Sequence, residues 1–266
     1  MIKKIFPFLA ISLIFSSCSE EFKPHVLPLN TYHISCDSLA FEAIHGHFKE
    51  NIYVDAVIEH KHLKRKSKLR IRGDSSREYP KKSLKVKITE GMRLFETKKF
   101  NFNAEYKDPS FSHSYLSSLV FKEIGYPCFS SFYAKLFLNN TFHGLFLEIE
   151  NIDKDFLIRN GLNPKGDLFK ATKDGACLYS VDEVDSKWER KTNKKSSWRP
   201  LMKLIEQINS VADEEFFVFI NNNFNYTKLI DYLAVNIFIA NGSTNYHNYY
   251  LYRDAENHGK WLLLPW

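Results

Sequence analysis

The sequence has little cysteine, little excess charge and no long apolar run. Its four cysteines include no CxxC pair, the spacing that typifies a zinc site. A formal net charge of +6 over 266 residues is a small excess for a nucleic-acid-binding chain, so we do not expect a nucleic-acid partner. The apolar-dominated run at residues 5–15 is too short for a membrane-spanning helix. No internal repeat or low-complexity tract occurs.

The N-terminus has the pattern of a secretory signal. A pair of lysines at positions 3 and 4 precedes the apolar run, and a Ser-Ser-Cys sequence ending at Cys18 follows it. We expect residues 1–17 to be removed and Cys18 to be lipidated, which would anchor the protein to a membrane in the cell envelope. Residues 18–28 would then be an exposed tether. Phe15 stands where such signals usually have Leu, so ordinary cleavage and secretion remain an alternative.

The composition of the rest predicts a folded protein. The sequence is 44% hydrophobic and 15% aromatic, which is enough for a substantial core in one large domain or in two lobes. Loss of two signal lysines would lower the formal charge from +6 to +4. The remaining cysteines, Cys36, Cys128 and Cys177, are interpreted as buried small side chains. An oxidising location would also permit one disulfide, whose pair the sequence does not define.

The first half of the chain is rich in strand patterns. Residues 31–88 alternate short β-rich runs with polar turns, and we expect antiparallel strands there. In the segment from Lys82 to Ile88, three apolar residues lie on one face and a serine and two lysines on the other, as a strand with one core face and one charged face requires: Leu84, Val86 and Ile88 against Ser83, Lys85 and Lys87. A helix is predicted from Asp108 to Gly125, and a hairpin from Tyr133 to Glu150 with its turn at two asparagines.

The second half is mainly helical by its pattern. We expect a short helix at residues 156–161 and a long polar surface loop at 173–200. Helices follow at 201–211, 216–220 and 226–240, and the apolar density of the last predicts a buried helix. Two strands close the chain, at 249–253 and 260–264, with a turn at 257–259.

Two loops carry residues suited to chemistry. Residues 72–83 combine glycine, hydroxyls and several cations between two strands, which suits a phosphate, although a basic hairpin loop is also a common solvated turn. Residues 242–248 lie between a helix and a strand, as a kinase catalytic loop does. Asn248 has the spacing of the metal-binding Asn there, while Ser243 stands where the Asp base is expected. A loop of turn-forming residues is the alternative.

The sequence around these loops resembles the CotH (spore-coat protein H) kinase-like family. RGDSSREYPKKSLKVK at 72–87 is similar to the family signature RGNSSRxxPKKSxKxK, with Asp74 in place of Asn. The resemblance runs from about Leu27 to the last residue, and its later pieces come in the family's order: NFNAEYKDPS at 101–110, LFLNNTFHGLFLEIENID at 136–153, GDLFKA at 166–171, NYHNYYLYRD at 245–254 and GKWLLLPW at 259–266.

The resemblance implies an α+β, atypical protein-kinase-like fold with two lobes. Residues 29–152 would form an N-terminal lobe of mainly antiparallel strands, and residues 153–266 an incomplete, helical C-terminal lobe. ATP with Mg²⁺ would be the cofactor, and Ser or Thr of exported proteins would accept the γ-phosphoryl group. Residues carried over to the ATP site are Arg72, Ser75, Ser76, Arg77, Lys82 and Glu150. Lys82 is assigned as the ion-pairing lysine, with Lys85 as its rival, and Asn248 as the metal ligand.

Three departures from the family pattern bear on activity. Ser243 cannot act as a carboxylate base, and the Asp-x-Asp that follows Pro-Trp in the family would come after Trp266. His113 stands where many relatives have Arg. We therefore expect a CotH-type phosphotransferase whose activity is in doubt in this chain. The alternative is a non-catalytic surface lipoprotein that uses the same scaffold to bind a partner protein or an anionic envelope polymer.

Overall fold

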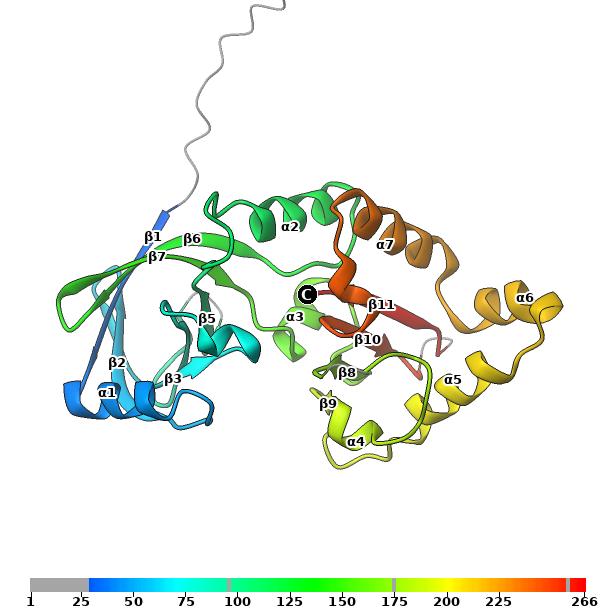
Figure 1. Ribbon diagram of the computed structural model, residues 1–266, viewed down its shortest axis with the longest axis horizontal. Coiled ribbons are helices and arrows are strands. Elements are labelled where there is room, and N and C mark those ends of the chain that lie inside the picture. The colour runs from blue at the N-terminus through cyan, green and yellow to red at the C-terminus, as the bar shows by residue number, and fades with distance from the viewer. Residues whose placement is uncertain (1–28, 95–96, 174–175, 257–258) are drawn as a thin grey trace, which may run out of the picture.

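The computed structural model describes residues 29–94, 97–173, 176–256 and 259–266 (Figure 1). The predicted signal peptide, Cys18 and the tether lie outside the described residues, as does most of the turn predicted at 257–259. The fold class is α+β, as expected, with a barrel and a smaller sheet that carries most of the helices. Among the described residues no helix has the length and apolar character to cross a bilayer.

A closed barrel forms the first half of the fold. Its strands follow one another around the barrel in this order: β1 (Leu29–Cys36), β2 (Val54–His60), β3 (Leu63–Arg72), β4 (Ser83–Ile88), β5 (Lys99–Asn103), β7 (Thr141–Ile149) and β6 (Ser131–Leu138). The even residues of β4 face the barrel core and are buried, as the period-two pattern predicted. One expectation is incomplete, because β1 pairs with β6 in parallel and this pairing closes the barrel.

The predicted hairpin is confirmed as β6 and β7, and its turn follows from local chemistry. Asn139 and Asn140 have φ of 47° and 66°, which asparagine tolerates better than most residues. A short helix, α1 (Ser38–Gly46), was missed within the strand-rich segment. Asp37 caps it by accepting a hydrogen bond from the Ala40 amide at 2.8 Å. The one-turn helix η1 (Ser75–Glu78) lies in the β3–β4 loop.

Helix α2 (His113–Glu123) begins later than predicted. The Asp108 carboxylate accepts hydrogen bonds from the backbone amides of Ser110 and His113, at 3.0 and 2.8 Å. These bonds fold residues 108–112 into turns before the helix begins. The next helix, α3 (Lys154–Arg159), is the one expected at 156–161 and starts after the N-cap Asp153.

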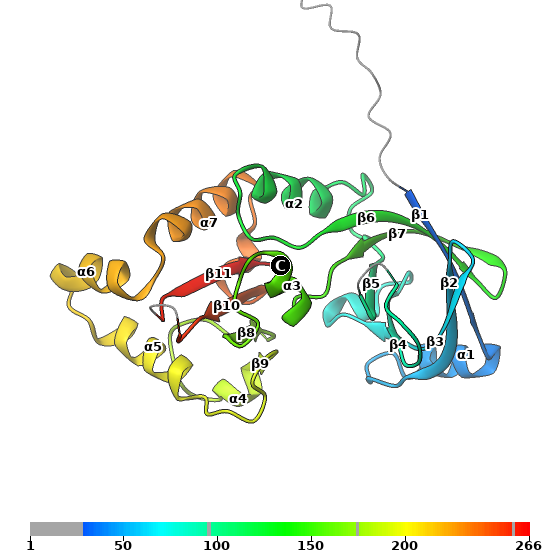
Figure 2. The ribbon, with the colours of Figure 1, turned by 180° about the vertical axis from the view of Figure 1, so that it is seen from behind.

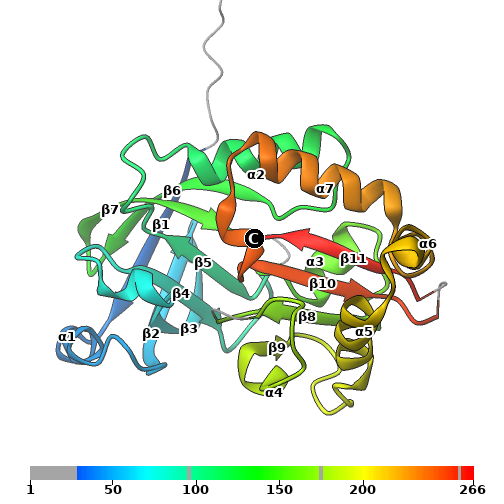
Figure 3. The ribbon, with the colours of Figure 1, turned by 45° about the vertical axis from the view of Figure 1, so that its right-hand side comes forward.

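An antiparallel sheet organises the second half of the chain (Figures 1 and 3). Its strand order is β11 (Trp261–Pro265), β10 (Tyr249–Arg253), β8 (Asp167–Ala171) and β9 (Trp188–Arg190). The accompanying helices are α4 (Val184–Lys187), α5 (Arg199–Ser210), α6 (Asp213–Asn223), α7 (Tyr226–Phe238) and the short η2 (Gly242–Asn245). Figure 2 shows from behind that α2 runs beside α7, and α2 also contacts the barrel strand β6.

Two predictions for this half are wrong. The long surface loop at 173–200 contains α4 and β9, and Trp188 and Arg190 in β9 are buried. A three-residue strand is too short to give a periodic pattern. Helix α7 buries only Tyr232, Val235 and Asn236, while Phe238 is 77% exposed. Its apolar density therefore does not reflect burial on all sides.

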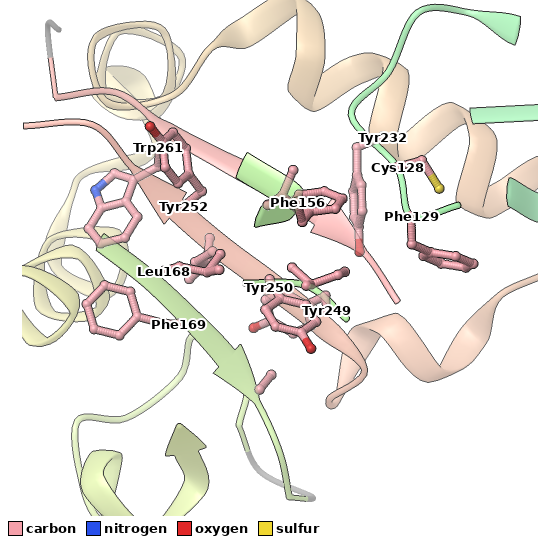
Figure 4. Packing of buried hydrophobic residues seen from close by; sticks show 14 of the residues in the cluster. Cys128, Phe129, Phe156, Leu168, Phe169, Tyr232, Tyr249, Tyr250, Tyr252 and Trp261 are labelled. Carbon is pink, nitrogen blue, oxygen red and sulfur yellow. The ribbon is translucent and has the colours of Figure 1, made fainter. Parts of the chain in front are cut away.

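The molecule has two apolar cores. One fills the barrel. The other surrounds the second sheet, where the rings of Phe169 in β8 and Trp261 in β11 lie 6.0 Å apart and the tyrosines of β10 belong to the same cluster (Figure 4). Outward-facing residues of β7, including Leu147, also belong to this second core. Segments before residue 153 thus help to hold the second half, and the barrel presents a fixed outer face to the second sheet.

No disulfide joins Cys36, Cys128 and Cys177, the three cysteines among the described residues. Cys128 is buried, and burial raises the pKa of its thiol to about 12. Cys36 and Cys177 are half-buried. The interpretation as small packed side chains fits Cys128 fully and the other two in part.

Candidate functional site

A cavity of about 1110 Å³ separates the outer face of the barrel from the second sheet. The barrel supplies β3, β4, β5 and the β3–β4 loop, and the second sheet supplies β8, β9 and β10. Among the described residues, ten cationic side chains line it against five carboxylates. The cations are Lys49, Arg70, Arg72, Arg77, Lys81, Lys85, Lys107, Lys170, Lys173 and Lys191, and the carboxylates are Asp74, Glu78, Glu105, Asp108 and Glu189. This excess suits a polyanion.

Strand alternation places the barrel's cations on the cavity side. Leu69 and Ile71 of β3 point into the barrel core, so Arg70 and Arg72 point outward. In β4 the same alternation directs Ser83 and Lys85 outward to the cavity. The sequence of these strands therefore builds one wall of the site without special backbone geometry.

Arg72 lies at the centre of this wall. Its guanidinium donates a hydrogen bond to Oδ1 of Asn103 and lies 5.5 Å from the ring of Trp266. Burial lowers the pKa of Arg72 to about 10, with Tyr250 and Arg70 as opposing smaller influences. Arg72 thus keeps its charge at neutral pH while most of its hydration is lost.

Lys85 and Lys170, on opposite walls of the cavity, both carry strongly depressed pKa values. Burial, followed by the positive charges of Lys191 and Arg72, lowers the pKa of Lys85 to about 7. Burial and Arg72 lower that of Lys170 to about 8, and its amine lies 4.8 Å from the ring of Trp266. Lys85 donates a hydrogen bond to Oδ1 of Asn151 at 3.2 Å. An anion in the cavity would favour the charged form of both lysines.

The β3–β4 loop keeps its shape through glycine. Gly73 has φ of 115°, and a Cβ there would lie 2.1 Å from Oγ of Ser76. Ser75 and Ser76 both line the cavity from η1, so two hydroxyls stand near the cations as the sequence predicted. The loop therefore offers close backbone approach and hydrogen-bonding groups together.

Arg77 lines the same cavity, yet its guanidinium is engaged in holding the fold. It donates to the carbonyls of Gly73, Phe48, Lys49 and Glu50 and to Oδ1 of Asn51, at distances of 2.6 to 3.2 Å. The side chain is 8% exposed. These bonds join η1 to the segment after α1, which gives Arg77 a structural role that sequence reasoning missed.

Lys82 does not point into the cavity. Its amine donates to the Arg77 carbonyl and lies 4.3 Å from the ring of Phe48. Lys82 precedes β4 with the parity of the core-facing residues, whereas Lys85 has the parity of the cavity wall. Of the two lysines considered from the sequence, Lys85 is the one the fold brings to the other cations.

Lys81 is a further cavity residue that the sequence did not single out. Its amine donates to the carbonyls of Ala104 and Leu145 and lies 4.3 Å from the ring of Phe146. Burial lowers its pKa to about 8. Lys81 shares the parity of Ser83 and Lys85, which face the cavity.

Glu150 lies away from this group. Its carboxylate pairs with Arg159 and accepts the Ser130 amide at 2.9 Å, and it lines a different cavity. The structure therefore does not bring Glu150 to the residues of the β3–β4 loop.

The two positions of the predicted catalytic loop diverge. Asn248 lines the cation-rich cavity and has φ of 61°. Ser243 is exposed, donates to Oδ1 of Asn241 at 2.9 Å and does not line the cavity. His113, the third departure from the family pattern, does line the cavity.

The donor set for a resident Mg²⁺ is poor. Within the described ranges no group of three or more His, Cys, Asp and Glu side chains is arranged to hold a metal ion. The carboxylate of Glu189 also lines the cavity, but it is already paired with the amine of Lys191 at 3.1 Å. Burial raises the pKa of Glu189, but the positive charge of Lys191 and the hydrogen bond from it have the larger combined effect. The pKa of Glu189 is therefore lowered. The side chains described do not fit a metal held by protein alone.

A barrel and a small antiparallel sheet that enclose a cation-rich cavity define an α+β protein suited to binding a polyanion. A family model described as CotH kinase protein matches residues 69–266, and the chain therefore belongs to the CotH family. The chain is similar to the inner spore coat protein H of Bacillus subtilis (strain 168), with 28% identity over 203 residues. That alignment covers 73% of this chain and 56% of the relative, so the chain spans little more than half the length of that relative.

Proposed function

We propose that this chain is an exported, lipid-anchored CotH-type protein that binds ATP in the cation-rich cavity and transfers the γ-phosphoryl group to Ser or Thr of exported proteins. The observation that carries the proposal is the concentration of ten cations around one cavity, next to the glycine and hydroxyls of the β3–β4 loop. A triphosphate would supply negative charge to balance the excess of cations around the cavity. Family membership supports the kinase-like assignment.

The proposed arrangement corresponds to two kinase-like lobes. The barrel would be the N-terminal lobe and the second sheet with its helices the C-terminal lobe, with the cavity between them. In this arrangement Arg72 and Lys85 reach the phosphates from the barrel, and Lys170 from the opposite wall. Holding a triphosphate between two walls would fix its orientation before transfer.

Magnesium would enter with the nucleotide in this proposal. Mg²⁺ commonly combines one or two protein oxygens with substrate phosphates, and Asn248 lines the cavity where it could add an amide oxygen. When bound, Mg²⁺ would supply positive charge that neutralises the phosphates. The protein's own part would then be electrostatic, through Arg72, Lys85 and Lys170.

The proposed location rests on the N-terminal pattern and on the relative. The signal-like residues 1–17 and Cys18 support export and lipid anchoring, and the relative is described as an inner spore coat protein. We therefore propose that this chain is located in the cell envelope.

A second candidate function is non-catalytic binding of a partner protein or an anionic envelope polymer in the same cavity. Ser243 favours it, because a hydroxyl stands at the position of the expected base and lies outside the cavity. The cation excess alone would hold a phosphate-rich polymer as well as a nucleotide.

Two measurements separate these functions. The first is the rise in melting temperature on adding MgATP, which we expect for the parent and for Lys82→Met but not for Arg72→Met combined with Lys85→Met. The second is transfer of labelled γ-phosphate to a Ser/Thr-containing acceptor. A shift with transfer supports the phosphotransferase, and a shift without transfer supports the binding scaffold. No shift with MgATP or pyrophosphate would rule out the cavity as the anion site.

A further inference from the structure

A second cavity, of about 1150 Å³, opens at one mouth of the barrel. It lies where β1 and β6 begin and β7 ends, with Asn30, Phe132 and Glu148 among its lining residues. Phe132 and Phe102 both pair with Glu148 in the barrel register. Phe102 and Tyr32 are fully buried and close the barrel beneath Glu148. Barrel mouths are common positions for small-ligand sites.

Glu148 is an unusual group for the floor of such a cavity. Its Oε2 accepts a hydrogen bond from the Tyr32 hydroxyl at 2.7 Å and another from Asn30 at 3.2 Å. Among the described residues, Oε1 has no hydrogen-bond partner and no cation forms an ion pair with the carboxylate. Burial raises the pKa of Glu148 despite these two hydrogen bonds, which lower it. A half-buried carboxylate with one oxygen that accepts no hydrogen bond favours a positively charged group beside it.

The rim carboxylates differ from Glu148 because each of them pairs with a cation, while Lys61 and Lys98 also line the cavity. Asp153 pairs with Lys99 at 2.6 Å, and Asp155 pairs with Arg93 at 2.8 Å. Apolar side chains share this rim, and Phe132 and Ile158 are 39% and 60% exposed. A ligand entering the cavity therefore passes apolar surface before it reaches an unpaired carboxylate.

We propose that the barrel mouth binds an alkylammonium group, with the ammonium on Oε1 of Glu148 and the alkyl chain against Phe132 and Ile158. The group could belong to a free primary amine or to a lysine side chain. This site lies apart from the cation-rich cavity and does not depend on the proposed phosphoryl transfer.

The test compares ligands of equal length that differ in charge. Calorimetric titration of the parent protein with n-hexylammonium should give saturable binding, whereas 1-hexanol and hexanoate should bind at least about tenfold more weakly, since a charged hydrogen bond contributes more than a neutral one. The affinity for n-hexylammonium should fall as the pH is lowered and Glu148 becomes protonated. Equal binding of 1-hexanol, or an affinity that does not fall with pH, would overturn the proposal.

Variants locate the binding within the cavity. Glu148→Gln keeps the shape and the contacts with Tyr32 and Asn30 but removes the charge, and we expect about a tenfold or larger loss of n-hexylammonium affinity. Asp155→Asn, a rim carboxylate already paired with Arg93, should change the affinity little. Undiminished binding by a folded Glu148→Gln variant would contradict the assignment. If that variant fails to fold, the ligand and pH comparisons on the parent decide.

A second titration identifies the source of the ammonium. If Nα-acetyl-lysine amide binds more tightly than n-hexylammonium, the natural ligand is a lysine side chain of a protein. The opposite order would indicate a free amine. Either order retains the site, and failure of both ligands to bind would exclude it, independently of any result with MgATP.

Discussion

Replacing Lys85 by Met should stabilise the protein at neutral pH, because a poorly hydrated cation is removed from among other cations. The pKa of Lys85 falls from 10.5 to about 7, which at about 1.36 kcal/mol per pH unit sets an upper limit of about 5 kcal/mol on the penalty. Lys85 is half-buried, so solvent screens part of this penalty, and the variant loses the hydrogen bond to Asn151. We expect the free energy of unfolding to rise by about 1–2 kcal/mol at pH 7.

The pH dependence distinguishes this cause from better packing of Met. Between about pH 7 and pH 10.5 the unfolded chain binds more protons at Lys85 than the folded chain does, so the parent becomes more stable as the pH rises. The advantage of Lys85→Met is therefore full below about pH 7 and should disappear by about pH 10.5. A gain that stays constant with pH would refute the electrostatic explanation.

Urea denaturation followed by tryptophan fluorescence measures this difference at several pH values. Lys87→Met is the matched control, since Lys87 lies on the same strand, is exposed and lines neither cavity. We expect that control to change the free energy of unfolding by less than about 0.5 kcal/mol at each pH. If Lys87→Met raised the free energy of unfolding as much as Lys85→Met does, the stabilisation could not be attributed to the position of Lys85 in the cavity.

Two further variants test the packing around the site. Arg77→Met should lower the free energy of unfolding by about 2–4 kcal/mol in urea titrations, because it leaves several carbonyls of residues 48–50 and 73 without their donor, whereas Ser75→Ala should cost little. Gly166→Ala should lower the melting temperature, with a cost of about 1–3 kcal/mol, since its Cβ would lie 2.6 Å from the Tyr252 ring. An unchanged melting temperature for Gly166→Ala would mean that the second sheet adjusts freely there.

The sequence predicted elements well where a pattern was long and its environment simple. The β6–β7 hairpin and the two closing strands follow directly from alternation and turn residues. The pattern failed where tertiary contacts decide. Residues 188–190 pair with β8 through only three positions, and Arg190 is buried against Asp167 and the ring of Phe169. No local signal marks such a strand within a polar segment.

The candidate site was also predictable only where its residues are close together in the sequence. The β3–β4 loop was visible because its residues are contiguous. Lys170 and Lys191 lie about a hundred residues away and join the site only when β8 and β9 pair beside the barrel. An isolated lysine in a short strand is ordinarily a surface residue, so their contribution needed the structure.

The choice between Lys82 and Lys85 shows where the sequence held more information than its motif. The motif directed attention to the lysine pair at 81–82, next to the start of the strand. The alternation from 82 to 88 places Lys82 with Leu84 and Val86, which fill the barrel, and Lys85 with the opposite face. A residue with core parity at the end of a barrel strand must turn its charge toward the barrel end, where Lys82 meets Phe48. Parity, applied to the functional residues as well as to the core, would therefore have favoured Lys85 before the fold was known.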